Sequence, residues 1–364
     1  MTCKKSLENL PNELLVFILQ HVSFKDLARL EQVSRRFGTV VHSVWNSLTN
    51  LVLKEDTVFG DFWRSDVERL DDPTFMAGVL SWLLSRVNFN VLEEFDASRL
   101  SLSPRFRSDP QWNELCSQAI VRAERPNTNL TSLDLSYLRI LALNEMTGLS
   151  SLRFVSLRCT NINDDQVANL LSSCPRLERL DLYACHGPSG RGFVTRSDSS
   201  DPLLLPNLKF LSITSCKNIK DIYMVPFLSM NGAYLVDGLS ASNLCKLNVS
   251  HRLYEAIVAS LVNTRRLELT CFMASFSQNL HNHVNLVDLD LSGSEANNRA
   301  FALVLNRCVR LERLWLNQVD NLNEETFTTM EIKCKIKKFF FKLLVTFLKN
   351  NIFVRFFVVE FTQV

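Results

Sequence analysis

The segment 174–182, CPRLERLDL, contains the pattern that decides the fold, and it returns almost unchanged at 308–316 as CVRLERLWL. The three leucines of each copy follow the spacing L-x-x-L-x-L. The second and third leucines are two residues apart, so a β-strand places them on the same face. Because one such unit cannot bury its apolar face alone, the pattern predicts a series of stacked units that share a core.

Variants of this pattern occur along most of the chain, and each predicts a strand. Two weaker copies are Leu92-Phe95-Ala97 and Thr264-Leu267-Leu269. The intervals between copies mostly fall in or near the range of roughly 20–29 residues that is typical of leucine-rich repeats. The sequence therefore predicts a right-handed α/β leucine-rich-repeat solenoid, shaped as a horseshoe. The clear copies are Leu130-Leu133-Leu135, Leu152-Val155-Leu157, Leu177-Leu180-Leu182, Leu208-Leu211-Ile213, Leu244-Leu247-Val249, Leu286-Leu289-Leu291 and Leu311-Leu314-Leu316.

The cysteines follow the repeat. Cys174 and Cys308 each lie three residues before the leucine that opens a copy, whereas Cys159, Cys185 and Cys216 lie shortly after a strand. Packing predicts such periodic placement, and a single catalytic nucleophile does not. The 10 cysteines include no CxxC pair, so the sequence predicts neither a zinc ribbon nor a thioredoxin-type motif. This usage resembles the cysteine-containing class of leucine-rich repeats.

Residues 6–50 predict a small helical module of another kind. Apolar residues recur at helical spacing in three stretches. We expect Asn12 to be the N-cap of the first helix, and Ser23 with Asp26 to open the second in an arrangement that resembles a capping box. A third helix is expected to begin near Ser34. Three helices in about 40 residues bury little surface by themselves, so surplus apolar surface on this module predicts a partner.

The module resembles the F-box over residues 7–50. Phe37 is a mild departure, because the family more often has Trp at that position. The matching elements are Leu10-Pro11-x-Glu13-Leu14-Leu15, Ile18-Leu19, Asp26-Leu27, Leu30 and Val33-Ser34-Arg35-Arg36-Phe37, with Trp45 where the family often has an aromatic residue. The resemblance implies binding to a Skp-family adaptor, with these contact residues: Leu10, Pro11, Glu13, Leu14, Ile18, Leu19, Leu27, Val33 and Phe37.

The same resemblance implies a function. The chain would be the substrate-recognition subunit of an SCF-type ubiquitin ligase, joined through the adaptor to a cullin and its RING subunit. The repeats would hold an unknown protein substrate for ubiquitin-dependent proteasomal degradation. The chain would supply proximity rather than bond chemistry, with no enzyme activity, cofactor or metal. A non-ligase F-box scaffold, a leucine-rich-repeat regulator of GTPases and a small-molecule receptor are the alternatives.

Strand alternation identifies the side chains expected to contact the substrate. Residues that flank the inward leucines point to the opposite, concave face of the sheet. Aromatic residues and arginine are enriched at interface hot spots, and exposed Phe154, Phe210 and Trp315 would be costly to leave in water. The predicted substrate-binding residues are Asp134, Phe154, Ser156, Arg179, Asp181, Tyr183, Phe210, Arg266, Glu268, Asp290, Arg313 and Trp315.

Composition and motifs exclude several other classes. The net charge is +2, and the segment 335–364 alone holds six Lys/Arg and one Glu, so the rest of the chain lacks the basic excess of nucleic-acid binders. No signal-peptide core and no run of 18 apolar residues occurs, so we expect a cytoplasmic or nuclear protein without a membrane span. The sequence contains no phosphate-binding loop and no GxSxG motif. We expect His281 and His283 in a solvated turn rather than at a metal.

We expect four regions along the chain. They are the F-box at 1–50, a helical linker at 51–91, the repeats at 92–334 and an atypical tail at 335–364. The linker should contain a helix from Thr74 to Val87 with Trp82 in the core. Two inserts, 186–206 and 217–243, stretch the repeat spacing, and the first is expected to be a loop. Long loops on solenoids either carry a binding function or are insertions without one, and both alternatives are open here.

The tail contains eight of the 25 phenylalanines and lacks Gly, Pro, Ala, Ser and Asp. Three interpretations are open: an unusual cap, a basic amphipathic segment on a membrane surface, or translated non-coding sequence. We favour the last, because AT-rich codons supply Phe, Lys, Ile, Asn and Leu. Transcript sequencing that shows these codons in an ordinary exon would remove this interpretation.

Overall fold

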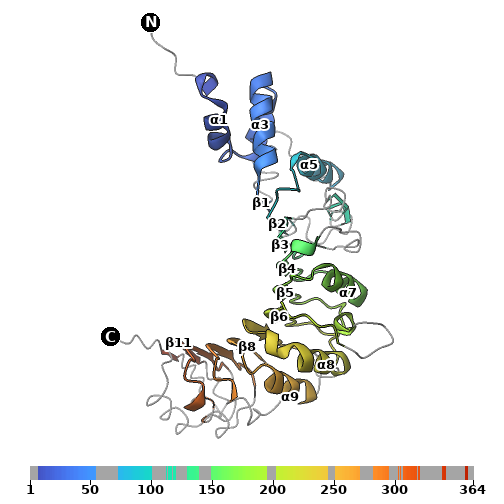
Figure 1. The fold of residues 1–364 in the computed structure, drawn as a ribbon, viewed down its shortest axis with the longest axis vertical. Coiled ribbons are helices and arrows are strands. Elements are labelled where there is room, and N and C mark those ends of the chain that lie inside the picture. The colour runs from blue at the N-terminus through green and yellow to red at the C-terminus, as the bar shows by residue number, and fades with distance from the viewer. Residues whose placement is uncertain are drawn as a thin grey trace, which may run out of the picture. The chain divides into compact units, whose positions relative to one another are not determined.

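The chain folds into two compact units, Met1–Asn161 and Ile162–Val364, each of which combines parallel strands with helices (Figure 1). The computed structural model describes residues 7–54, 73–100, 129–138, 149–194, 202–244, 251–270, 282–294, 338–341 and 357–359, with parts of 112–119 and 302–319. Among these residues no helix is both long and apolar enough to cross a bilayer.

The first unit begins with the three helices that the sequence predicts at its N-terminus. α3 packs against both α1 and α2, and its Trp45 is fully buried with its ring 5.5 Å from that of Phe24. α5 follows where a helix was predicted in the linker. The helices of this unit are α1 (Asn12–Leu19), α2 (Phe24–Glu31), α3 (Arg35–Ser47) and α5 (Pro73–Arg86), with short 3-10 turns at Leu7–Asn9 and Leu149–Ser151.

The helix starts agree with the sequence at two of three positions. The hydroxyls of Ser23 and Ser34 each accept the backbone N–H three residues on, at 3.2 Å. The prediction that Asn12 caps the first helix is wrong, because Pro11 occupies the cap position. The Asn12 side chain instead accepts two hydrogen bonds from Arg36, at 3.0 and 3.1 Å, and so ties the start of α1 to α3.

Four parallel strands complete the first unit, and the first of them lies between α3 and α5 in the chain. β2 is the weak copy at Leu92-Phe95-Ala97, whose Phe95 pairs with Leu133 of β3. β1 was not predicted: it lies in the stretch expected to be a helical linker, and it pairs with β2. The strands are β1 (Asn50–Lys54), β2 (Glu94–Arg99), β3 (Ser132–Asp134) and β4 (Phe154–Ser156).

The second unit continues with a longer series of short strands. Neighbours are parallel, except for the last pair, which is antiparallel and lies in the tail. The central residues of β5 to β10 are leucines with no exposed surface. The strands are β5 (Arg179–Asp181), β6 (Phe210–Ser212), β7 (Gly238–Ser240), β8 (Arg266–Glu268), β9 (Asp288–Asp290), β10 (Arg313–Trp315), β11 (Lys338–Phe341) and β12 (Phe357–Val359).

One predicted strand is misplaced. The strand between β6 and β8 is Gly238–Ser240, not the copy Leu244-Leu247-Val249, most of which lies outside the described residues. Here the buried residues are Leu235, Leu239 and Ala241, so that one extra residue separates the first two and alanine replaces the third leucine. Because the L-x-x-L-x-L template requires a shorter gap, the copy was not recognised.

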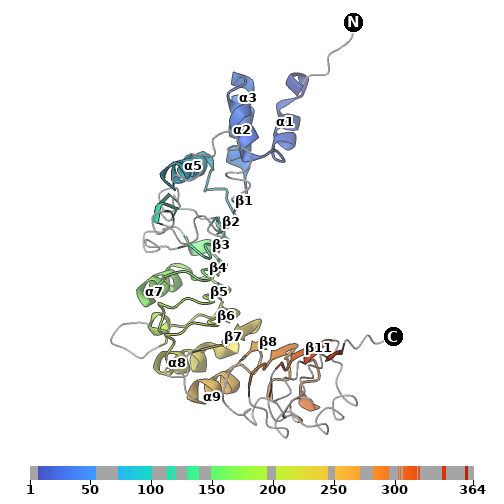
Figure 2. The ribbon, with the colours of Figure 1, turned by 180° about the vertical axis from the view of Figure 1, so that it is seen from behind.

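Helices of the second unit lie along one side of its strands (Figures 1 and 2). They are α7 (Asp164–Ser173), α8 (Asp221–Asn231) and α9 (His251–Ser260). The stretch 217–243 is therefore no insert, because it supplies α8 and β7 of an ordinary repeat. In the insert 186–206, the short helix Arg191–Phe193 packs on α7, and the Asp164 carboxylate accepts hydrogen bonds from the backbone of Ser189 and Gly192.

Gly187, next to this short helix, has no space for a side chain. A Cβ atom there would lie 1.9 Å from the backbone oxygen of Ile162, which cannot move aside cheaply. We expect Gly187→Ala to lower the free energy of unfolding by about 2 kcal/mol. Gly78→Ala in α5 is the control, because nothing lies within 4 Å of its Cβ position and alanine favours helix by about 0.5–1 kcal/mol. Denaturant titration measures both, and a neutral Gly187→Ala would contradict the close approach.

Several side chains that the sequence left ambiguous lie in the core. His283 is fully buried and its Nε2 lies 2.8 Å from the Val258 backbone oxygen, so the expectation of a solvated turn is wrong for this residue, whereas His281 lies outside the described residues. None of the described cysteines forms a disulfide, and Cys174, Cys185 and Cys308 are buried as the repeat predicts. Burial also raises the pKa of the Cys116 thiol, which disfavours the thiolate that a nucleophile requires.

Candidate functional site

The first candidate site lies on α1, which carries two apolar stripes. Leu15 and Leu19 face the other helices and are buried. Leu14, Phe17 and Ile18 form a second stripe at spacings of three and four, and they are 50%, 65% and 40% exposed. With Pro11, which is also exposed, this stripe is called the head surface below. A short module with two apolar stripes needs a partner to cover the second one.

The residues predicted to contact an adaptor divide into two groups. Glu13 and Val33 are exposed together with Pro11, Leu14 and Ile18, and Leu10 is half-buried. Leu19, Leu27 and Phe37 are at most 6% exposed, so they support the surface from inside rather than contact another chain. Phe17 was missed, although its position three residues after Leu14 is a signal that the sequence contains.

A groove in the same unit lies between α2 and α5. Its volume is about 560 Å³, and its walls include Phe24, Ala28, Val79, Trp82 and Arg86. The Arg86 guanidinium pairs with Glu31 at 3.2 Å and lies over the Trp82 ring at 5.2 Å. Trp82, which we expected in the core, is therefore half-buried and lines this groove.

The second candidate site is the strand face of the second unit. The register aligns two rows of side chains on either side of the buried leucines. The first row is Arg179, Phe210, Gly238, Arg266, Asp288 and Arg313, and the second row is Asp181, Ser212, Ser240, Glu268, Asp290 and Trp315. Half of the first row is arginine, and half of the second row is aspartate or glutamate. Sequence reasoning missed Ser240, because the strand that carries it was predicted at another position.

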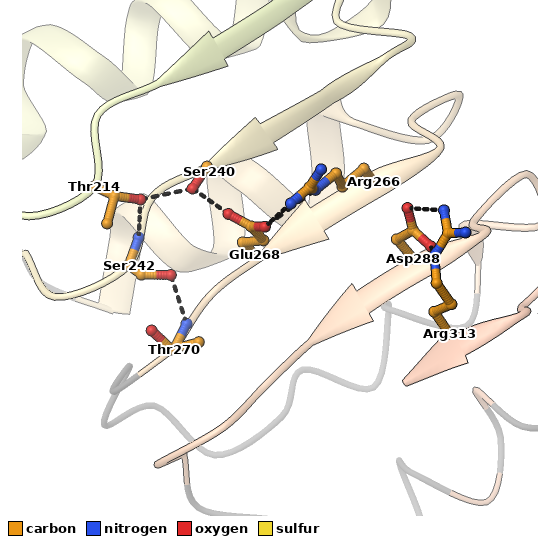
Figure 3. A network of polar contacts seen from close by, with 8 residues as sticks. All are labelled: Thr214, Ser240, Ser242, Arg266, Glu268, Thr270, Asp288 and Arg313. Atoms are coloured by element: carbon orange, nitrogen blue, oxygen red, sulfur yellow. Dashed lines mark hydrogen bonds and ion pairs between the residues drawn. The ribbon is translucent and has the colours of Figure 1, made fainter. Parts of the chain in front are cut away.

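Hydrogen bonds hold much of the second row in place (Figure 3). The hydroxyl oxygens of Thr214 and Ser240 lie 2.6 Å apart, and the Ser240 hydroxyl donates to Glu268 at 2.5 Å. Glu268 also accepts from Arg266 Nε at 3.0 Å. A network whose members satisfy one another is rigid, so this part of the face is pre-organised for a ligand rather than adaptable.

The exposure of the predicted aromatic residues differs from expectation. Phe154 of β4 is 42% exposed, as predicted. Phe210 is only 6% exposed, because the Arg179 guanidinium lies 4.1 Å above its ring. Tyr183 and Trp315 are half-buried. At this position the strand face therefore presents the Arg179 side chain to solvent, where we expected Phe210 to be exposed.

Three of the predicted substrate-binding carboxylates have a structural role. Asp134, Asp181 and Asp290 each accept the backbone N–H of the residue two positions on, at 2.9 Å, and so fix the turn that leaves the strand. The pKa values of Asp134 and Asp290 are raised by burial, against hydrogen bonds that favour the ionised form. In the first unit, half-buried Ser156 bonds similarly within the protein, with its hydroxyl oxygen 2.8 Å from that of Ser136.

The raised pKa of Asp290 predicts that the stability of the protein depends on pH, and replacement of Asp290 by asparagine should remove this dependence. An aspartate whose pKa is raised in the folded state destabilises the protein once it ionises. Its contribution to the free energy of unfolding therefore falls as the pH rises from 3.8, the ordinary pKa, through the raised pKa. Asp290→Asn keeps the acceptor for Ser292 and loses the repulsion from Glu268. We expect the variant to be slightly more stable than the wild type at pH 7, with a smaller difference at pH 4.5. Denaturant titrations at both values test this, and a variant that is less stable at pH 7 would show that the charge supports the turn.

One comparison with known proteins concerns the helical head. A family model described as F-box-like matches residues 7–50. No curated protein matches the chain. Among solved structures, an internalin (inlF) from Listeria monocytogenes is similar over 92% of this chain and 93% of that chain, at 18% identity and a TM-score of 0.41.

The parallel register and the periodic buried leucines define a leucine-rich-repeat protein. An F-box-like domain at residues 7–50 precedes these repeats in the chain.

Proposed function

We propose that the chain is the substrate-recognition subunit of an SCF-type cullin–RING ubiquitin ligase. The observation that carries the proposal is the head surface: Leu14, Phe17 and Ile18 are exposed on an F-box-like domain. Burial of apolar surface is favourable by about 25 cal/mol per Å², so their exposure supports a surface that a second protein covers. F-box domains generally bind Skp-family adaptors, and we assign this partner to the head surface.

In this proposal the two parts of the chain have separate partners. The adaptor connects the head to a cullin and its RING subunit. The strand face binds a protein substrate and raises its local concentration near the ubiquitin-transfer machinery, which is a gain in proximity without bond chemistry. The chain is therefore not an enzyme, needs no cofactor and acts in the cytoplasm or the nucleus.

Affinity capture from cells tests the ligase role. The intact chain is captured with and without proteasome inhibition, beside a variant in which Leu14 and Ile18 are both replaced by glutamate. We expect a cullin with the intact chain and none with the variant, and further proteins enriched only under inhibition. Capture of the adaptor without a cullin would instead support a non-ligase scaffold.

A further inference from the structure

A cavity of about 380 Å³ opens on the strand face of the second unit. Its walls come from the first row and from the residues just before the strands. They are Arg179, Phe210, Asp237, Arg265, Arg266, Val287, Asp288 and Arg313. Arginine contributes half of these side chains, so an anion is the ligand that the walls favour.

Gly238 lets neighbouring residues approach closely at one point of the first row. It stands in the first row between Phe210 and Arg266, and it contributes no side chain. A Cβ atom at this position would lie 2.8 Å from the Arg266 backbone oxygen and 3.3 Å from Cδ2 of Phe210. The row therefore has no side chain at this strand, and Phe210 and Arg266, which both line the cavity, come close together across the position.

Two of the four arginines are held by carboxylates (Figure 3). Arg266 pairs with Glu268, and Arg313 donates two hydrogen bonds to Asp288, at 2.5 and 2.7 Å. Within the described part of the chain, Arg179 and Arg265 form no ion pair. Arg179 is nevertheless held in place, because its guanidinium lies over the Phe210 ring at 4.1 Å from the centroid.

The charges also indicate the kind of anion. The four guanidinium groups face three carboxylates, those of Asp237, Asp288 and Glu268, which leaves one positive charge in excess. A single carboxylate matches this excess. A phosphate carries about −1.5 to −2 at pH 7 and would leave the cavity negative beside Asp237 and Asp288.

We infer that this cavity binds an aspartate or glutamate side chain in an acidic segment of the protein that the repeats hold. The inference rests on the proposed function only in taking that segment from a substrate. The planar guanidinium groups of Arg179 and Arg265 supply the free donors for the carboxylate. The fixed pairs at Arg266 and Arg313 hold the opposite wall in position.

Peptide binding to the full chain tests the inference. The probes are fluorescent pools of decapeptides, randomised except for a central Glu, Gln or phosphoserine. We expect the Glu pool to bind at least about tenfold more tightly than the Gln pool, which is about 1.4 kcal/mol. Arg179→Gln with Arg265→Gln should remove this preference. Arg265→Gln alone, at an exposed side chain, should weaken it without a risk to the fold.

The control is Arg176→Gln, which removes one exposed arginine outside the cavity and should bind as the wild type. Equal binding of the Glu and Gln pools, or an unchanged preference in the double variant, would overturn the inference. Tighter binding of the phosphoserine pool would also overturn it in favour of a phosphate, and displacement of the peptides by a 20-nucleotide RNA would do so in favour of nucleic acid. None of these outcomes depends on the head surface, so a chain that binds an adaptor but no acidic peptide would leave the proposed function intact.

Discussion

Replacement of both Leu14 and Ile18 by glutamate is expected to weaken binding of the full chain to a Skp-family adaptor at least about a hundredfold, or about 2.7 kcal/mol. Both side chains are exposed on α1, so the change removes apolar contact area and places two charges at the centre of the head surface. Leu15 and Leu19, on the buried stripe, are unchanged, and the module should keep its fold. Isothermal titration calorimetry with the purified adaptor measures the loss.

The matched control replaces two exposed apolar residues elsewhere. Ile222 and Met230 of α8 are 67% and 47% exposed, and their replacement by glutamate changes the net charge by the same amount. We expect this variant to bind the adaptor as the wild type does. If both double variants lost affinity equally, charge rather than the head surface would explain the effect.

Asn231→Leu is expected to lower the free energy of unfolding by about 4 kcal/mol. Asn231 has no exposed surface, and its amide satisfies the backbone of a neighbouring loop: it accepts from Leu205 N–H at 2.7 Å and donates to the Leu203 oxygen at 2.8 Å. Leucine would fit the apolar surroundings but leave both backbone groups without a partner. Each buried group left unpaired costs about 1–3 kcal/mol.

Asn207→Leu is the control for this prediction. The Asn207 amide also donates to a backbone oxygen, that of Pro175 at 2.9 Å, but it lies at the surface, where water replaces the lost bond. We expect a cost below about 1 kcal/mol. Denaturant titration of the two variants should separate them clearly, and equal effects would contradict the account of the buried amide.

The repeats were predictable because their signal is periodic. Leu180 and Leu182 are buried for the same reason as Leu314 and Leu316, so one copy predicts the others. Even the weak copy at Thr264 folds as predicted, since its hydroxyl donates to the Leu235 oxygen at 2.6 Å and can therefore stand where leucine is usual. β7 was missed because an extra residue changed the spacing.

The roles of side chains on the strand face were less predictable. Alternation places Asp290 on the outer face correctly, but whether its carboxylate meets solvent or turns back to Ser292 depends on the local backbone. Phe210 was expected to be exposed, and only the structure shows Arg179 above it. Arg265 lies before its strand, so a search confined to strand positions passes over it.

The F-box resemblance predicted which residues matter but not how. Leu27 matches the family pattern as well as Leu14 does, and Phe37 departs from it only mildly, yet both are buried and Leu14 is exposed. A family motif includes the positions that pack the core of the module as well as those that contact a partner. Only the burial of each side chain separates the contact surface from its support.

The most direct test of the central claim is the mass of the full chain when it is mixed with a purified Skp-family adaptor at micromolar concentration. Size-exclusion chromatography with light scattering should show one species whose mass is the sum of one chain and one adaptor. Two separate peaks at the masses of the free proteins would contradict the assignment of the head surface, and with it the ubiquitin-ligase role.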